Sequence, residues 1–149
     1  MRIAMIGTGY VGLVSGACFS EFGHVVTCVD KDQGKIDSLN AGKMPIYEPG
    51  LDVLVANNVK AGRLSFTTDI AAPVSEADAV FIAVGTPTAR HGEGGQADLT
   101  YVYAAAQEIA AALKDYTVVV TKSTVPVGTG RMVHRILQHY APQGVRSEE

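Results

Sequence analysis

Three glycines and one aspartate near the start of the chain have the types and spacing needed to bind phosphate and ribose. Gly7, Gly9 and Gly12 directly follow an apolar stretch and open a run of small residues with a helical pattern. A glycine turn that leads into a helix presents free backbone amides and the positive end of the helix dipole, which together bind phosphate. Asp30 ends the next apolar run, roughly twenty residues further on, where a carboxylate accepts hydrogen bonds from a ribose diol. This pattern predicts a dinucleotide site.

The three glycines are expected to serve different purposes in that turn. Gly7 lets the chain turn sharply off the strand, and Gly9 lets the backbone approach a pyrophosphate closely. Gly12 allows the helix to pack against the strand. A glycine turn that serves close packing alone, with no ligand, is the alternative interpretation.

The charges beside Asp30 bear on the choice of cofactor. A carboxylate at that position repels the 2′-phosphate of NADP and therefore favours NAD. Lys31 and Lys35 lie close enough in sequence to oppose this preference. Lys35 taken alone is interpreted as a solvated helix residue.

The composition indicates a globular chain with a substantial core. The chain has 149 residues, of which 47% are hydrophobic and 18% charged, and its net charge is −3. Without a basic cluster or a long apolar run, nucleic acid and membranes are not expected as partners. The N-terminus shows no signal peptide, so a cytoplasmic location is expected. Cys18 and Cys28 lie in apolar segments and are interpreted as reduced core residues.

Apolar β-branched runs alternate with helical patterns along the whole chain, which predicts an α/β fold with a doubly wound, Rossmann-type parallel sheet and helices on both faces. The expected strands are Arg2–Ile6, Val25–Val29, Leu64–Thr67, Ala79–Val84 and Thr117–Thr121. The expected helices are Val11–Phe22, Asp32–Asn40, Leu51–Ala61, Asp69–Ser75, Leu99–Lys114 and Gly128–His139. A complete dinucleotide fold has six strands, so the last strand is expected to be missing and residues 1–149 to be the first part of a longer chain.

Two loops are too distinctive to be simple connections. Residues 43–51 lead into a helix, and residues 86–97 leave the carboxyl end of a strand, where ligands bind in open α/β sheets. The glycines of the second loop suggest a mobile segment that orders with a ligand, or a plain flexible loop. Glu48 is interpreted as a cap or hydrogen-bond acceptor rather than a general acid. Asp98 is expected to be the N-cap of the helix Leu99–Lys114. Gly42 is expected to lie just past the end of the helix Asp32–Asn40, where a C-cap glycine belongs.

The four histidines show no metal-ligand spacing, and no metal site is predicted. His134 and His139 lie five positions apart and diverge on their helix.

Four separated segments resemble the UDP-glucose/GDP-mannose dehydrogenase family. They read GTGYVGL from Gly7, PIYEPGL from Pro45, GTP from Gly85 and KSTVPVGT from Lys122. The resemblance extends from residue 1 to about residue 140, in the family's order. Within the family, the first and last segments are more similar to members that oxidise UDP-glucose than to those that oxidise GDP-mannose or UDP-N-acetylmannosamine.

The resemblance implies a function in nucleotide-sugar metabolism and polysaccharide biosynthesis. It implies NAD-dependent oxidation of the C6 alcohol of UDP-glucose to UDP-glucuronate, with two NAD molecules reduced per substrate, by a protein that is a homodimer at full length. The central helix and the part that binds the UDP-sugar and carries the catalytic cysteine would lie beyond residue 149. The chain alone is therefore expected to bind NAD without oxidising the sugar.

The resemblance also implies which residues contact NAD. Thr124 is expected to act as an auxiliary residue near the reacting centre as well. The implied contacts are Gly7, Gly9, Tyr10, Val11, Gly12, Asp30, Lys35, Thr86 and Thr124.

Three alternatives remain open from the residues alone. The same domain serves other nucleotide-sugar dehydrogenases, and a non-enzymatic dinucleotide-sensing module could carry the same glycine turn. A transferase with a different adenosine cofactor could also use this fold, because a fold does not determine a function. The absence of a basic stripe weighs against the sensing module. The three-glycine spacing favours a pyrophosphate, which S-adenosylmethionine lacks.

Overall fold

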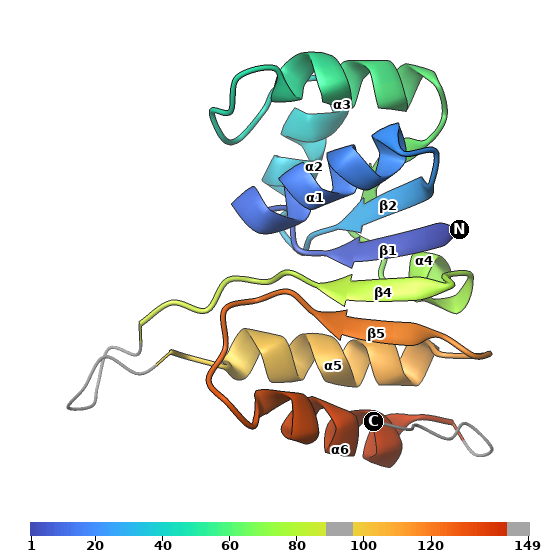
Figure 1. Cartoon of the computed structure of the whole chain (residues 1–149), viewed down its shortest axis with the longest axis vertical. Coiled ribbons are helices and arrows are strands. Elements are labelled where there is room, and N and C mark those ends of the chain that lie inside the picture. The colour runs from blue at the N-terminus through green and yellow to red at the C-terminus, as the bar shows by residue number, and fades with distance from the viewer. Residues whose placement is uncertain (89–96, 143–149) are drawn as a thin grey trace.

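A parallel five-stranded sheet with the strand order β3-β2-β1-β4-β5 forms the centre of the molecule. The computed structural model describes residues 1–88 and 97–142. The strands are β1 (Arg2–Ile6), β2 (Val25–Val29), β3 (Leu64–Thr67), β4 (Ala79–Ile82) and β5 (Val118–Thr121). The strand arrowheads in Figure 1 point to one side of the molecule, where the chain leaves each strand. This order is that of a doubly wound dinucleotide-binding sheet and confirms the predicted fold class.

Helices cover both faces of the sheet. The helices are α1 (Tyr10–Glu21), α2 (Gln33–Asn40), α3 (Leu51–Lys60), α4 (Ala71–Ser75), α5 (Thr100–Ala112) and α6 (Thr129–Tyr140). Helices α1, α2 and α3 share one hydrophobic core with the sheet, and α4, α5 and α6 share another. Figure 1 shows the first group beside β1 and β2, and α5 and α6 beside β5.

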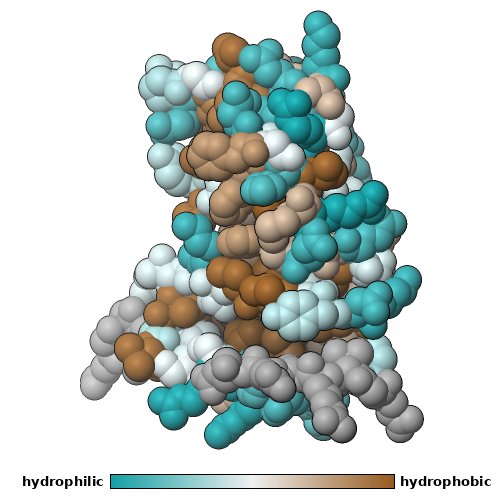
Figure 2. Space-filling model, turned by 45° about the vertical axis from the view of Figure 1, so that its right-hand side comes forward, coloured by the Kyte–Doolittle hydropathy of each residue, from teal (hydrophilic) through white to brown (hydrophobic). Residues whose placement is uncertain are grey.

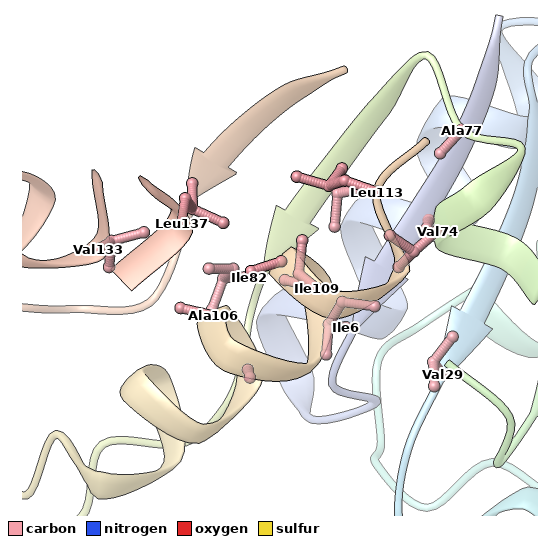
Figure 3. Close-up of a cluster of buried hydrophobic side chains, with 14 of the residues drawn as sticks. Ile6, Val29, Val74, Ala77, Ile82, Ala106, Ile109, Leu113, Val133 and Leu137 are labelled. Carbon is pink, nitrogen blue, oxygen red and sulfur yellow. The ribbon is translucent and has the colours of Figure 1, made fainter. Parts of the chain in front are cut away.

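Strand β1 contributes to both cores because successive side chains of a strand point to opposite faces. Ile3 and Met5 pack with α1, α2 and α3, whereas Ala4 and Ile6 pack with α4, α5 and α6. Figure 3 shows Ile6 in the second core, together with Ile82 of β4, Ile109 of α5 and Leu137 of α6. A strand buried on both faces reads as a continuous apolar run, which is why its bounds were predicted correctly.

The predicted strand Ala79–Val84 was two residues too long. The ladder between β4 and β5 ends at Ile82, whose carbonyl oxygen accepts hydrogen bonds from the amides of both Lys122 and Ser123. The carbonyl oxygen of Val84 then accepts a hydrogen bond from the Ser123 hydroxyl at 2.7 Å instead of from a neighbouring strand. The segments that follow β4 and β5 separate beyond this point, at the edge of the sheet where a ligand is expected.

Most helix ends differ from the prediction by one or two residues, and α2, α4 and α5 begin later than predicted because an aspartate outside each helix accepts from one of its first amides. Asp32 is the N-cap of α2 and accepts from the amide of Lys35. The N-cap of α5 is Leu99 and not Asp98 as predicted, so α5 begins one residue later than expected; Asp98, one position before the N-cap, accepts from the amide of Thr100 at 2.9 Å. Gly42 follows α2 with φ +75°, which confirms its predicted position beyond the helix end.

Both cysteines are free thiols, and Cys28 is a core residue as predicted, whereas Cys18 is only partly buried. Cys28 is buried in β2, and this burial raises the pKa of its thiol to about 12. The thiol is therefore protonated at neutral pH and is a poor nucleophile. Gly16 of α1 faces it so closely that a β-carbon there would lie 2.7 Å from Cys28 Sγ, as expected for a packing glycine.

Strand β5 is an edge of the sheet and is incompletely covered. Val118 is exposed and the other three residues of the strand are half-buried. Figure 2 shows a hydrophobic band between hydrophilic margins on one face of the molecule. Within residues 1–88 and 97–142, no helix is long and apolar enough to span a membrane, and no cluster of three potential metal-ligating side chains occurs.

Candidate dinucleotide-binding site

The turn between β1 and α1 has a shape that two of its glycines make possible. Gly7 has φ +108°, and a β-carbon at this position would lie 2.5 Å from the carbonyl oxygen of Ala83. A β-carbon at Gly12 would lie only 1.9 Å from the carbonyl oxygen of Gly7. The amide of Gly7 also donates to the carbonyl oxygen of Val29 at 2.7 Å, which ties the turn to the end of β2. No other residue type fits at Gly7 or Gly12 without a shift of the backbone.

Gly9 has a different role from the other two glycines. It is the N-cap of α1, and a β-carbon built on it would have nothing within 4 Å. Because Gly9 has no side chain, it leaves the first amides of the helix uncapped and the space in front of them open. Free amides at a helix N-terminus form a site for a phosphate group.

A cavity of about 590 Å³ lies between the carboxyl ends of the strands and helix α5. The glycine turn forms one part of its wall through Gly7 and Gly9, and β2 adds Asp30. The other lining residues come from the carboxyl ends of β1 to β4, from the start of α2 and from α5: Ile6, Val29, Lys31, Asp32, Lys35, Thr68, Ile70, Ala83, Val84, Gly85, Tyr101, Ala104, Ala105 and Glu108. This is the place where open α/β sheets bind their ligands.

The carboxylate of Asp30 holds the glycine turn in place. Its Oδ2 accepts hydrogen bonds from the amide of Thr8 at 2.9 Å and from the Thr8 hydroxyl at 2.6 Å. Its Oδ1 accepts from the amide of Asp32 at 3.0 Å, and Lys35 Nζ lies 3.7 Å from Oδ2. Burial raises the pKa of Asp30, but the hydrogen bonds and the Lys35 ammonium lower it further, so that its pKa lies below the ordinary value.

Asp30 still has an acceptor site for a ligand. A carboxylate has about four lone-pair directions, and the protein uses two on Oδ2 and one on Oδ1. Its side chain is 15% exposed and lines the cavity. One lone pair of Oδ1 can therefore accept a hydroxyl of a ribose.

Of the residues predicted to contact the cofactor, Gly7, Gly9, Asp30 and Lys35 line this cavity. Val11 and Gly12 lie in the first turn of α1 behind Gly9 and are not part of the cavity wall. Tyr10 is also outside the wall.

The Tyr10 side chain turns toward the loop 43–50. It is 54% exposed, and its hydroxyl donates to Glu48 Oε2 at 2.8 Å. This hydrogen bond and the charge of Glu48 raise the pKa of the Tyr10 phenol, which keeps it protonated as the donor. Glu48 is thus a hydrogen-bond acceptor that attaches the loop to the start of α1, as interpreted from the sequence.

Thr86 and Thr124 lie together beyond the ends of β4 and β5. The Thr86 hydroxyl donates to the carbonyl oxygen of Thr124 at 3.0 Å. Neither lines the cavity, although Gly85, next to Thr86, does. Thr88 and Ala97 form an isolated antiparallel bridge at the base of the loop 86–97. The predicted ordering of this loop concerns residues 89–96, which lie outside the described residues.

Several residues of the site were missed in the sequence. Thr8 is 1% exposed and supplies two of the hydrogen bonds to Asp30. The position of a hydroxyl residue between the first two glycines of the turn could have indicated this role of Thr8. Glu108 gave no signal, because it reaches the cavity from α5 and pairs with Lys31, 77 positions earlier in the chain.

The sequence matches a family profile described as "UDP-glucose/GDP-mannose dehydrogenase family, NAD binding domain" over residues 1–147. A UDP-glucose 6-dehydrogenase of Rhizobium meliloti is 65% identical over 95% of this chain. A crystal structure of a GDP-mannose dehydrogenase ternary complex from Pseudomonas aeruginosa has 41% identity and a TM-score of 0.87 over 95% of this chain. A UDP-glucose dehydrogenase from Pyrobaculum islandicum has 40% identity and a TM-score of 0.88 over 97% of this chain.

The chain spans about a third of the length of these relatives, which is 32% of the Rhizobium protein and 33% of each of the two solved chains. The match covers the glycine turn, Asp30 and all the strands that surround the cavity. The chain therefore belongs to the UDP-glucose/GDP-mannose dehydrogenase family, as an NAD-binding domain.

Proposed function

We propose that residues 1–149 are the NAD-binding domain of a longer UDP-glucose 6-dehydrogenase, which also contains a central helix and a C-terminal part that binds the UDP-sugar. The observation that carries the proposal is the cavity beside the glycine turn, with uncapped amides at Gly9 and a free acceptor on Asp30. The identity of 65% with a UDP-glucose 6-dehydrogenase supports the choice of substrate.

Each cofactor-contacting residue is proposed to have a definite role. The amides after Gly9, including those of Tyr10 and Val11, bind the diphosphate, and Gly12 keeps α1 close to β1. Asp30 accepts a hydrogen bond from the adenosine ribose. The nearby ammonium group of Lys35 favours the ionised form of the Asp30 carboxylate.

The nicotinamide end is assigned to the strand ends near Thr86 and Thr124. Bound NAD supplies the hydride acceptor there. The Thr86 hydroxyl holds the backbone of Thr124, which leaves the exposed Thr124 side chain free to orient substrate or water as an auxiliary residue.

GDP-mannose is the second candidate substrate. The GDP-mannose dehydrogenase from Pseudomonas aeruginosa is as similar to this chain as the archaeal UDP-glucose dehydrogenase is, with 41% and 40% identity. The NAD-binding domain therefore does not by itself discriminate between the two sugars. The Rhizobium relative favours UDP-glucose.

The test compares the chain of 149 residues with the protein expressed from the whole reading frame. With NAD and UDP-glucose, the short chain should bind NAD but produce no NADH absorbance at 340 nm. The longer protein should produce about two NADH per UDP-glucose, and less with GDP-mannose. Sustained turnover by the short chain would show that the catalytic groups lie within it and would overturn the proposal.

An Asp30→Ala variant should bind NAD about tenfold more weakly and discriminate less between NAD and NADP. It loses one hydrogen bond to the ribose, the charge that repels a 2′-phosphate, and the acceptor that holds the Thr8 amide and hydroxyl in the glycine turn. Isothermal titration with both cofactors measures the two affinities. Asp32→Asn is the matched control, since it removes a second carboxylate of the same cavity wall while its amide oxygen still caps α2. If the unmodified chain bound NAD and NADP equally well, the ribose assignment would be wrong.

Homodimer formation, a cytoplasmic location and a part in polysaccharide biosynthesis belong to the same proposal. In the chain of 149 residues, the outer edge of β5 at the end of the described sheet supports association of two copies, because an unpaired strand edge can pair with another strand. Light scattering on the longer protein tests the dimer.

A further inference from the structure

Five charged side chains of the described residues line the cavity: Asp30, Lys31, Asp32, Lys35 and Glu108. They comprise three carboxylates and two ammonium groups. Each of the two lysines is paired with a carboxylate, Lys35 with Asp30 and Lys31 with Glu108. The cavity wall therefore carries a net negative charge and has no lysine free of a carboxylate partner.

Lys31 is the residue that could otherwise attract NADP. It follows directly after Asp30 at the end of β2, and a cation near this position accommodates the 2′-phosphate in domains that bind NADP. An unpaired ammonium here would counteract the repulsion of a 2′-phosphate by Asp30. Lys31 instead donates to Oε1 of Glu108, which belongs to α5 and also lines the cavity.

We propose that Glu108 is a positioning residue for cofactor selection. It holds Lys31 away from a 2′-phosphate and so favours NAD over NADP. The inference rests on the proposed function, in which the adenosine ribose lies at Asp30. Because the Lys31 and Glu108 side chains are 74% and 35% exposed, their ion pair adds little to the stability of the fold. Its removal should therefore change cofactor preference without unfolding the domain.

The experiment measures the dissociation constants of NAD and NADP for the parent chain and for Glu108→Gln by isothermal titration at about 0.02 M salt. NADP should bind roughly three- to tenfold more tightly to the variant, whereas the NAD constant should change less than about twofold. At about 0.5 M salt the gain should shrink, because exposed charges are screened. Glu76→Gln is the matched control, since Glu76 pairs with Arg2 in another exposed ion pair at the opposite ends of the strands. Glu76→Gln should leave the ratio of the NADP and NAD dissociation constants unchanged.

The dependence on Lys31 separates this role from a general change of charge. When Lys31 has already been replaced by glutamine, the additional substitution Glu108→Gln should give no gain in NADP affinity. An equal gain in that background would overturn the proposal, and so would an unchanged ratio in Glu108→Gln when both chains bind NAD. If Glu108→Gln failed to fold, Glu108→Asp would replace it, because its carboxylate is one methylene shorter and holds Lys31 less well; NADP should again bind more tightly than to the parent, and the gain should disappear in the Lys31→Gln background. A parent chain that does not bind NAD would instead contradict the proposed function.

Discussion

Replacing Gly12 with alanine is expected to lower the free energy of unfolding by on the order of 3 kcal/mol. The new β-carbon would lie 1.9 Å from the carbonyl oxygen of Gly7 and 2.9 Å from its carbonyl carbon, so the backbone of the turn or the whole of α1 must move. For a domain of this size the loss corresponds to a fall of about 6 to 12 °C in the melting temperature. Thermal and urea unfolding, followed by circular dichroism, measure it.

Gly130→Ala is the matched control for this prediction. Gly130 lies within α6, and a β-carbon there would have nothing within 4 Å. Alanine is favoured over glycine in a helix by up to about 1 kcal/mol, and Gly130 lies in the first turn, so this variant should be as stable as the parent or slightly more stable. If Gly12→Ala were also as stable as the parent, the described packing of α1 against the turn would be wrong.

Replacing Gly9 with alanine should have the opposite pattern, with the fold intact and NAD affinity lost. Gly9 has φ −71° and ψ −172°, which alanine adopts readily, and its β-carbon would meet no protein atom within 4 Å. The methyl group would stand in the open space before the uncapped amides, where the diphosphate is proposed to bind. We expect NAD to bind at least about tenfold more weakly, a cost of about 1.4 kcal/mol, with an unchanged melting temperature.

The comparison of the two variants separates packing from ligand binding. Gly12→Ala changes stability first and loses NAD affinity as a consequence, whereas Gly9→Ala changes NAD affinity alone. Full NAD affinity in Gly9→Ala would show that the diphosphate does not approach this part of the backbone.

The bounds of β1, β2 and β3 could be predicted from the sequence to the residue. Strand β1 is buried in both cores and reads as an unbroken apolar run after Arg2, and β2 is apolar except for Thr27. Strand β3 instead alternates, with Leu64 and Phe66 buried in one core and Ser65 exposed between them. Strand β4 was predicted too long because its apolar sequence continues to Val84. The ladder stops earlier for a reason that the sequence does not display, the hydrogen bonds from Ser123.

The candidate site was only partly predictable for a similar reason. The glycine turn and Asp30 belong to one local motif with fixed spacing, and the structure brings them together. The partners of these residues are set by the tertiary fold. Glu108 meets Lys31, and Glu48 meets Tyr10, across 77 and 38 positions of sequence, and spacing along a single element does not reveal such pairs.

A nuclear magnetic resonance titration of the chain with NAD, following its backbone amides, tests the central claim most directly. If the amides at the start of α1 bind the diphosphate, those of Gly9, Tyr10 and Val11 should show the largest changes in chemical shift, and the amides around Asp30 should follow. Changes concentrated elsewhere, for example in the loop 42–52, with the turn after β1 unaffected, would contradict the account.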